Sequence, residues 1–221
     1  GSTPPAERQD VLIRWGSRAR VRFAPARVLN STSVLQFSSD KLAMLQKLGE
    51  NGVAVPPFQL EPPNFSQWWQ GGAWIARSRH HQGGQGFALC LQSQDVVRAQ
   101  QSGCADYFIR YIPTQGEYRV HCFLGQALCT AQKVSEDGDL HLRNYHNGWR
   151  FHYQDSSNPE MENLACRAMQ AIGLDFGAVD IIQSDWGEYF VLETNSAPGL
   201  DGENCPGFHR YLQAFRAELG L

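Results

Sequence analysis

The sequence lacks several features that would assign it to particular protein classes. Its 221 residues carry a formal net charge of −3, and no run of Lys and Arg alternates with aromatic residues, so we expect no nucleic-acid-binding surface. No apolar stretch reaches the roughly 18 residues of a membrane span. The opening segment GSTPPAERQD contains no apolar run of signal-peptide length. We therefore expect a cytoplasmic protein that does not bind membranes.

Metal-binding cysteine pairs and common nucleotide motifs are also missing. The six cysteines, at positions 90, 104, 122, 129, 166 and 205, include no CxxC pair, which favours free thiols over disulfides or a zinc site. His80 and His81 are adjacent, so their side chains diverge on an extended backbone and we expect no shared metal. The absence of GKS, GKT, GxGxxG and internal repeats argues against a P-loop protein, a dinucleotide-binding fold and a solenoid.

The apolar pattern that is present predicts an α+β fold. Helices are predicted at residues 40–50, 158–173 and 207–219, and the first follows an N-cap serine and aligns Leu42, Leu45 and Leu48. Strands are predicted at residues 11–16, on both sides of a glycine loop within 73–91, and at 106–112, 117–124, 126–133 and 176–195, with turns at 113–116, 125 and 184–187. Residues 17–39 and 59–72 are predicted to be irregular. Strands in meander order with intervening helices indicate two lobes.

A carboxylate-rich hairpin near the C-terminus is the most informative segment. Glu193 and Asn195 are two residues apart and share one face of a strand, and Asp180 lies on the neighbouring strand. Hard oxygen donors of this kind suit Mg²⁺, which keeps waters and nucleotide phosphates as its other ligands. In the alternative interpretation, Asp180 is a surface carboxylate and Asn195 caps a loop. The otherwise apolar strands favour the metal site, because embedded polar groups need partners.

The loop HHQGGQG, residues 80–86, has glycines that would let backbone amides approach a phosphate, although a glycine-rich hairpin tip is often only a turn. Basic residues that could neutralise phosphate are Lys41, Arg77, Lys133 and Arg143, although each is individually more typical of a surface cation.

Along EYRVHCF, residues 117–123, the side chains of Glu117, Arg119 and His121 share one face. That pattern fits either a solvated sheet face or the lining of a charged site.

Taken in chain order, these segments resemble the ATP-grasp superfamily, especially its glutathione-synthetase-like and ribosomal-protein glutamate ligase branch. The matching segments, within residues 39–200, are SDKLAMLQKLGENGVAVPPF, WIARSRHHQGGQGFAL, YFIRYIPTQGEYRVHCFLG, GAVDII and EYFVLETNSAPG. The last segment is the most specific, because family members share a carboxylate strand followed by ExNxxPG. The resemblance implies an ATP-grasp domain at 40–221, with a lid lobe at about 73–112 and a catalytic lobe at about 113–221, after a reduced N-terminal segment at 1–39.

The resemblance also implies roles for individual residues. The implied magnesium ligands, with Mn²⁺ as an alternative metal, are Asp180, Glu193 and Asn195. The implied ATP-binding residues are Lys41, Arg77, Gly83, Gly84, Gly86, Arg110, Tyr111, Ile112 and Glu117, and the implied catalytic residues are Arg119, Arg143 and Asn144. Arg77 stands where the family usually has lysine, and its planar fork differs from a point-charge ammonium.

The implied reaction joins a carboxylate and an amine through an acyl phosphate, with release of ADP and phosphate. Forty residues precede Lys41, where family ligases usually carry a full pre-grasp domain. We therefore expect a peptide or protein substrate, or a partner protein or second copy that completes the site. Two alternatives remain: an ATP-grasp kinase, and a degenerate nucleotide-binding module of a larger assembly.

Overall fold

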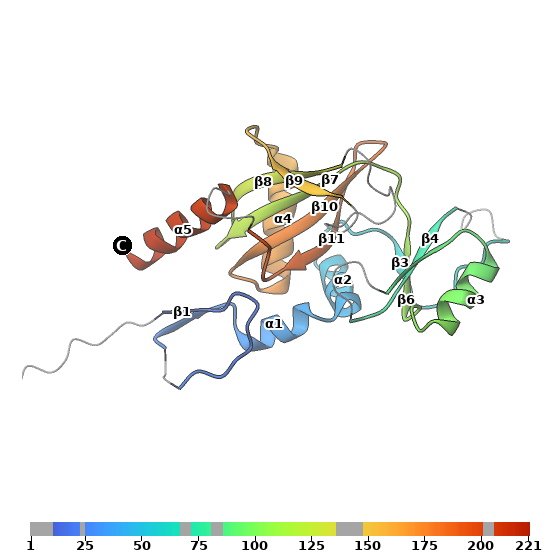
Figure 1. The fold of residues 1–221 in the computed structure, drawn as a ribbon, viewed down its shortest axis with the longest axis horizontal. Coiled ribbons are helices and arrows are strands. Elements are labelled where there is room, and N and C mark those ends of the chain that lie inside the picture. The colour runs from blue at the N-terminus through green and yellow to red at the C-terminus, as the bar shows by residue number, and fades with distance from the viewer. Residues whose placement is uncertain (1–10, 23–24, 67–71, 81–85, 136–147, 201–205) are drawn as a thin grey trace, which may run out of the picture.

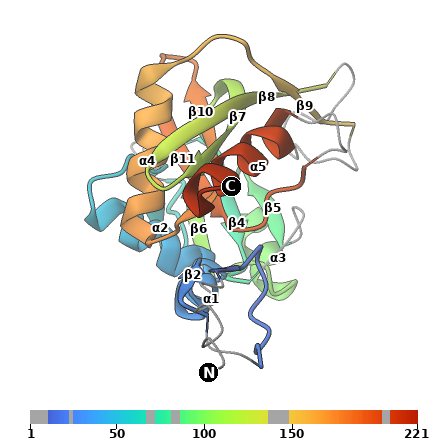
Figure 2. The ribbon, with the colours of Figure 1, turned by 90° about the vertical axis from the view of Figure 1, so that its left-hand side faces the viewer.

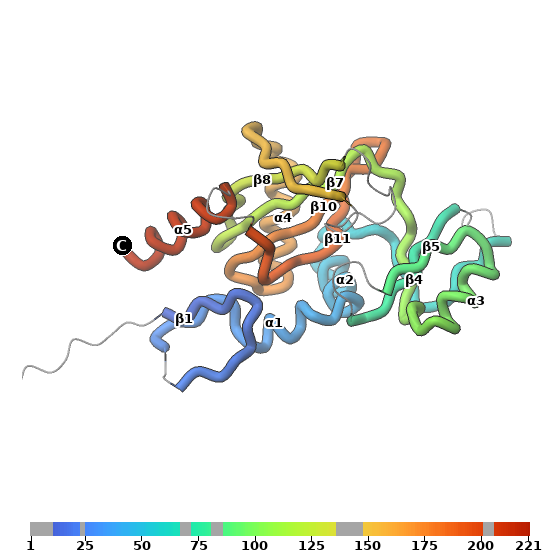
Figure 3. The backbone as a smooth tube through the Cα atoms, in the orientation of Figure 1, coloured from blue at the N-terminus to red at the C-terminus, as the bar shows by residue number. Residues whose placement is uncertain are grey.

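The computed structural model describes residues 11–22, 25–66, 72–80, 86–135, 148–200 and 206–221 (Figure 1). Two β-sheets dominate this part of the chain, a five-stranded sheet and a four-stranded sheet, and a pair of short strands lies near the N-terminus. Figure 3 follows the chain from β6 (Tyr107–Arg110) of the smaller sheet directly into β7 (Thr114–Phe123) of the larger one. No helix among the described residues has the length and apolar character needed to cross a membrane.

The larger sheet is antiparallel, with strand order β11-β10-β7-β8-β9. Its strands are β7 (Thr114–Phe123), β8 (Gln126–Val134), β9 (Arg150–Tyr153), β10 (Phe176–Ser184) and β11 (Tyr189–Asn195). Helix α4 (Pro159–Ile172) covers one face, where Val120 and Cys122 of β7 join the main core. Because side chains alternate along a strand, Glu117, Arg119 and His121 lie on the opposite face.

Helix α4 forms because its sequence supplies both caps and an apolar stripe. Asn158 caps the first turn by accepting from the amide of Met161 at 3.1 Å, and Gly173 ends the helix with φ +86°, a left-handed conformation suited to glycine. Its buried side chains are Met161, Ala165, Ala168, Met169 and Ile172. Helix α2 (Lys41–Glu50) contributes Leu42, Met44, Leu45 and Leu48 to the same core.

The smaller sheet lies on the right of Figure 1 with helix α3 (Ser93–Gln101) against it. Its strands, in the order β3-β6-β4-β5, are β3 (Phe58–Gln59), β4 (Trp74–Arg77), β5 (Phe87–Cys90) and β6 (Tyr107–Arg110). Val96 and Ala99 of α3 pack with Trp74, Ala76 and Phe108 in a second core. This lobe therefore has a hydrophobic core of its own.

A third cluster joins the two ends of the chain. The N-terminal elements are the parallel strands β1 (Val11–Ile13) and β2 (Arg27–Leu29) and helix α1 (Thr32–Ser38), and the C-terminal element is α5 (Pro206–Leu219). The Trp15 ring stacks on Phe176 at 5.3 Å, and Tyr211 of α5 packs edge-on against Trp15 at 5.1 Å. Figure 2 shows α5 lying across the strands of the larger sheet.

The α+β fold with two lobes is confirmed, as are the three predicted helices and the hairpin turn near residue 185. Three local predictions were wrong. Residues 17–39 are not wholly irregular, because they contain β2 and α1. Thr114–Gly116 form the start of β7 and not a turn. The N-cap of α2 is Asp40 and not a serine, and its side chain accepts from the amide of Ala43 at 3.1 Å. Helix α3 and strand β9 were not predicted. The described cysteines are free thiols, as expected.

Candidate active site

A β-bulge places the two hairpin carboxylates side by side. Asp180 of β10 pairs with Glu193 of β11, whereas the next pair is Ile181 with Val191, so Leu192 is an extra residue in β11. With regular pairing, Asp180 would face Leu192, and Glu193 would point with Val191 into the core beneath α4. The bulge therefore brings both carboxylates to the face opposite α4, the site face.

Asn195 lies two residues beyond Glu193 and pairs with Ala178 of β10. Its Oδ1 accepts from the amide of Ala197 at 2.9 Å, so the loop-capping contact of the alternative interpretation is present. The backbone is crowded here, because a Cβ at Gly177 (φ +152°) would lie 2.5 Å from the carbonyl oxygen of Asn195. An amide oxygen has two lone pairs, so this contact leaves one acceptor position for a further partner.

Asp180 is held by a two-point ion pair with Arg119 of β7. Arg119 donates from Nε to Oδ1 at 2.7 Å and from Nη2 to Oδ2 at 2.8 Å, and the side chains are 12% and 8% exposed. Burial alone would raise the pKa of Asp180, but the charge and hydrogen bonds of Arg119 outweigh it and the pKa lies below its ordinary value. Burial opposes the charge on Arg119, yet Asp180 raises its pKa overall. Both groups are therefore charged at neutral pH.

Glu193 is paired with Lys41, the first residue of α2, at 2.8 Å between Oε2 and Nζ. The amide of Lys41 donates to the carbonyl of Arg79 at 3.0 Å, which ties the start of α2 to the segment after β4. Burial tends to raise the pKa of Glu193, but Lys41, together with Arg119, lowers it below the ordinary value. The carboxylate is therefore ionised, and a helix end fixes its cation.

A third ion pair lies further along the site face. Glu117 pairs in register with Lys133 of β8, and the two side chains form an ion pair at 2.5 Å with exposures of 10% and 12%. Most of the polar row is buried: counted as whole residues, Glu117 is 8% exposed and His121 only 1%, and the side chain of Arg119 is 12% exposed. The row is therefore not the solvated face of a sheet. Of the two interpretations of residues 117–123, the structure supports the lining of a charged site.

The end of β6 and the linker that follows it carry three of the implied ATP-binding residues, Arg110, Tyr111 and Ile112, which the family resemblance places beside the adenine edge. The amides of Arg110 and Tyr111 already donate to the carbonyls of Pro57 at 2.7 Å and Ala73 at 3.0 Å. Ile112 is 7% exposed, and the Arg110 guanidinium lies over the Trp74 ring at 5.4 Å. Any pairing with an adenine edge would therefore use the Ile112 amide or the linker carbonyls.

Arg77 ends β4 and pairs in register with Tyr107 of β6. Its guanidinium hydrogen-bonds the Tyr107 side chain and lies over the Phe87 ring at 5.8 Å. Burial raises the pKa of Tyr107 to about 12, opposed by Arg77, and Glu193 lies near enough to raise it further. Tyr107 thus lies in the main hydrophobic core, bonded to Arg77 of β4 and within the electrostatic influence of Glu193, and sequence analysis did not select it.

The predicted residues Gly83, Gly84, Arg143 and Asn144 lie outside the described residues. Gly86 is described, with φ +62°, and its carbonyl accepts from the amide of Ser78 at 3.2 Å. Phe151, which sequence analysis also did not select, lies against the site cations. Its signal in the sequence is the alternation of aromatic residues in WRFHY, residues 149–153.

The fold and the site face define the class of protein. A four-stranded sheet leads directly into an antiparallel sheet that presents carboxylates and cations on one face, and this fold is shared with solved structures of ATP-grasp ligases. One is the ATP-grasp ligase PsnB complexed with minimal precursor, Mg and ADP, at TM-score 0.63 and 19% identity, covering 86% of this chain and 62% of that one. Another is a D-alanine–D-alanine ligase from Bacillus anthracis, at TM-score 0.62 and 14% identity, covering 85% and 72%. These likenesses show an ATP-grasp fold.

The family follows from the sequence comparison. Residues 72–206 match the family model of the RimK-like ATP-grasp domain, and the chain belongs to this family. A probable alpha-L-glutamate ligase of Marinobacter nauticus is 30% identical over 191 residues, covering 81% of this chain and 62% of the relative. A probable alpha-L-glutamate ligase of Haemophilus influenzae is 30% identical over 188 residues, covering 78% and 60%. This chain thus spans about three fifths of the length of these relatives.

Proposed function

We propose that this chain carries the nucleotide-binding and catalytic part of an ATP-dependent, ADP-forming carboxylate–amine ligase. The observation that carries the proposal is the site face, where Asp180 and Glu193 lie side by side with Arg119 and Lys41 bound to them. Family membership and the names of the relatives, which are ligases, support the same reaction class.

The oxygen donors of the hairpin fit Mg²⁺. Asp180, Glu193 and Asn195 offer two ionised carboxylates and one amide, hard ligands that leave the remaining positions to water and phosphate oxygens. Among the described residues, no three His, Cys, Asp or Glu side chains gather into a metal-holding group, so the amide is needed as the third donor. When bound, the ion would neutralise phosphate charge, and Mn²⁺ satisfies the same donors.

Binding of Mg-ATP would reassign the charged partners. Arg119 and Lys41 now neutralise the carboxylates, and they are the cations nearest to where phosphates would meet the metal ligands. Arg77 would add positive charge from β4, and Glu117 of β7 would accept from ribose hydroxyls. The division into a lid lobe at 73–112 and a catalytic lobe at 113–221 is supported by the linker between β6 and β7.

The proposed chemistry has two steps. An oxygen of the substrate carboxylate attacks the γ-phosphorus of ATP while the bond to the ADP oxygen breaks, giving an acyl phosphate and ADP. An amine nitrogen then attacks the acyl carbon, inorganic phosphate leaves with the former carboxylate oxygen, and the amine proton passes to solvent. Arg119 would stabilise the charge on the transferred phosphoryl group, because its guanidinium is fixed and always charged. Arg143 and Asn144 are retained as proposed catalytic residues.

The substrate class is proposed to be a peptide or protein carboxylate with an amino acid as the amine. This rests on the PsnB structures, which contain a precursor peptide, and on relatives that are named glutamate ligases. We also propose that a partner protein or a second copy of this chain completes the substrate site, and that the protein is cytoplasmic.

Calorimetry with a non-hydrolysable ATP analogue tests the site first. We expect Mg²⁺-dependent binding by the wild type, its loss in Glu193→Gln, and unchanged binding in Glu188→Gln, a matched change on the exposed turn of the same hairpin. The Glu193→Gln variant should also fail to release ADP when carboxylates and amines are supplied together. Equal binding by both variants would exclude Glu193 from the metal site, and no binding by the folded wild type would contradict the proposal.

A further inference from the structure

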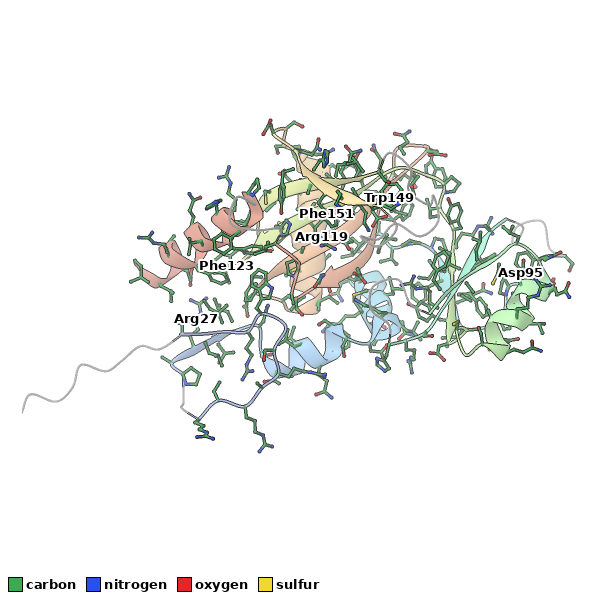
Figure 4. All side chains as sticks on the ribbon, in the orientation of Figure 1. Arg27, Asp95, Arg119, Phe123, Trp149 and Phe151 are labelled. Carbon is green, nitrogen blue, oxygen red and sulfur yellow. The ribbon has the colours of Figure 1, made fainter. Side chains whose placement is uncertain are left out.

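One aromatic ring lies against two cations of the site face. The guanidinium carbon of Arg119 lies 4.3 Å from the centroid of the Phe151 ring, and Nζ of Lys133 lies 5.6 Å from it. Both distances are within the range of cation–π attraction. Figure 4 shows Phe151 beside Arg119 in the middle of the larger sheet. Phe151 belongs to β9, the edge strand of that sheet.

The register of the sheet explains how an edge residue reaches a central strand. Phe151 pairs with Lys133, and Lys133 pairs with Glu117, so these three side chains form a row across β9, β8 and β7. In the adjacent row, the residue between Arg119 and Tyr153 is Ala131, which is fully buried. Its methyl group is too short to separate the larger side chains on either side. Phe151 therefore leans diagonally over Ala131 onto Arg119.

The contacts of Arg119 divide its guanidinium into three parts. Nε and Nη2 donate to Asp180, the central carbon of the guanidinium lies 4.3 Å from the centroid of the Phe151 ring, and the Nη1 end is used by neither contact. Asp180 alone would fix one edge but would leave the plane able to tilt about that edge. A ring packed 4.3 Å from the guanidinium carbon restricts this tilt, so the direction of Nη1 depends on both contacts.

We propose that Phe151 is a positioning residue for the reaction, which holds the plane of Arg119, and secondarily the ammonium of Lys133, for the transferred phosphoryl group. This inference rests on the proposed ligase function. The ring touches no reacting atom in this role and acts through Arg119. Because positioning matters most when charge develops in the transition state, weakening the contact lowers kcat more than it weakens nucleotide binding.

The test weakens the face of the ring without changing its shape. Phenylalanine at position 151 is replaced by its monofluoro, difluoro and trifluoro analogues, since each fluorine reduces the negative potential of the face and the fold is left intact. For a contact between a partly buried ring and a guanidinium that is 12% exposed, we expect kcat for ADP release to fall stepwise to about one tenth at the trifluoro analogue. Affinity for the ATP analogue should change by less than about threefold, and Phe151→Trp should retain near wild-type kcat because it keeps an aromatic face.

Phe37 provides the matched control, because its ring also carries a cation, with Nζ of Lys47 at 4.9 Å, but lies on α1 away from the site face. The same fluorinated series at Phe37 should leave kcat unchanged. A flat kcat across the series at 151, or an equal decline at 37, would overturn the proposal.

A second measurement does not depend on activity. A double-mutant cycle of Phe151→Leu and Arg119→Gln in urea unfolding should show that the two changes are not additive, because each removes the same contact. If the wild type releases no ADP with any substrate pair, the ligase function fails, while this cycle still decides whether Phe151 and Arg119 interact. Additive effects would remove the physical basis of the positioning role.

Discussion

The buried histidine of β7 gives a prediction that can be worked out from the structure. His121 is 1% exposed, its ring lies 6.0 Å from that of Tyr153 and 5.5 Å from that of Tyr211, and its Nδ1 has no hydrogen-bond partner among the described residues. Phenylalanine has a similar shape and needs no partner. We therefore expect His121→Phe to keep the fold and to remove one source of acid sensitivity.

The size of this acid sensitivity follows from the pKa of His121. Burial, together with the charge of Arg119, lowers this pKa to about 4, while Asp180 opposes the shift. In the unfolded chain this side chain binds a proton below about pH 6.5, whereas the folded protein does not until about pH 4. The unfolded state therefore binds more protons between these values, and the free energy of unfolding decreases as the pH falls. The full loss is about 3 kcal/mol, reached below pH 4, and none of it is present above pH 6.5.

Urea unfolding of the wild type and of His121→Phe at several pH values between 7.5 and 4 measures this effect. The wild type should lose stability faster than the variant across the window from about pH 6.5 to 4. His152→Phe, a matched change at an exposed position of β9, should follow the wild type. Parallel curves for wild type and His121→Phe would refute the reasoning, because they would mean that His121 binds protons equally in both states.

Three further changes test other contacts. Asp180→Asn leaves Arg119 buried without its counterion and should lower the free energy of unfolding by about 3 kcal/mol, measured in urea; a change below about 1 kcal/mol would mean that water replaces the pair. Arg77→Lys keeps the charge and should weaken binding of the ATP analogue by no more than about threefold, whereas loss of binding by calorimetry would show that the guanidinium fork is required. Gly177→Ala places a Cβ against the carbonyl of Asn195 and should destabilise the protein by about 2 kcal/mol and weaken Mg²⁺-dependent binding; an unchanged thermal midpoint would contradict this.

Much of the fold could be predicted because several elements carry strong local signals. Helix α4 has an asparagine cap, an apolar stripe and a terminal Gly173, and each signal survives in the structure. Helix α1 and strand β9 are too short, at seven and four residues, for periodicity to distinguish them from loops. Pro113 before the stretch and Gly116 at its end favour a turn at Thr114–Gly116, but pairing with β10 keeps these residues extended. Tertiary pairing here overrides the local preference.

The site could be predicted in its residue types but not in its arrangement. Simple alternation from Val191 would have put Glu193 in the core, and Glu193 reaches Asp180 only because Leu192 is an extra residue in the strand. Nothing in LETN marks a bulge. Lys41 and Phe151 reach the site from elements far away in the sequence, so their contacts depend on packing that local patterns do not encode.

The three ion pairs of the site face balance three carboxylates against three cations. If a phosphate chain alone bound Lys41 and Arg119, the half-buried Glu193 and the buried Asp180 would lose their counterions. If a divalent cation alone bound the two carboxylates, Lys41 and Arg119 would lose their ion-pair partners. When both arrive together, each group exchanges one partner of opposite charge for another. We therefore expect nucleotide and metal to bind with positive cooperativity, and linkage requires each to strengthen the other by the same factor.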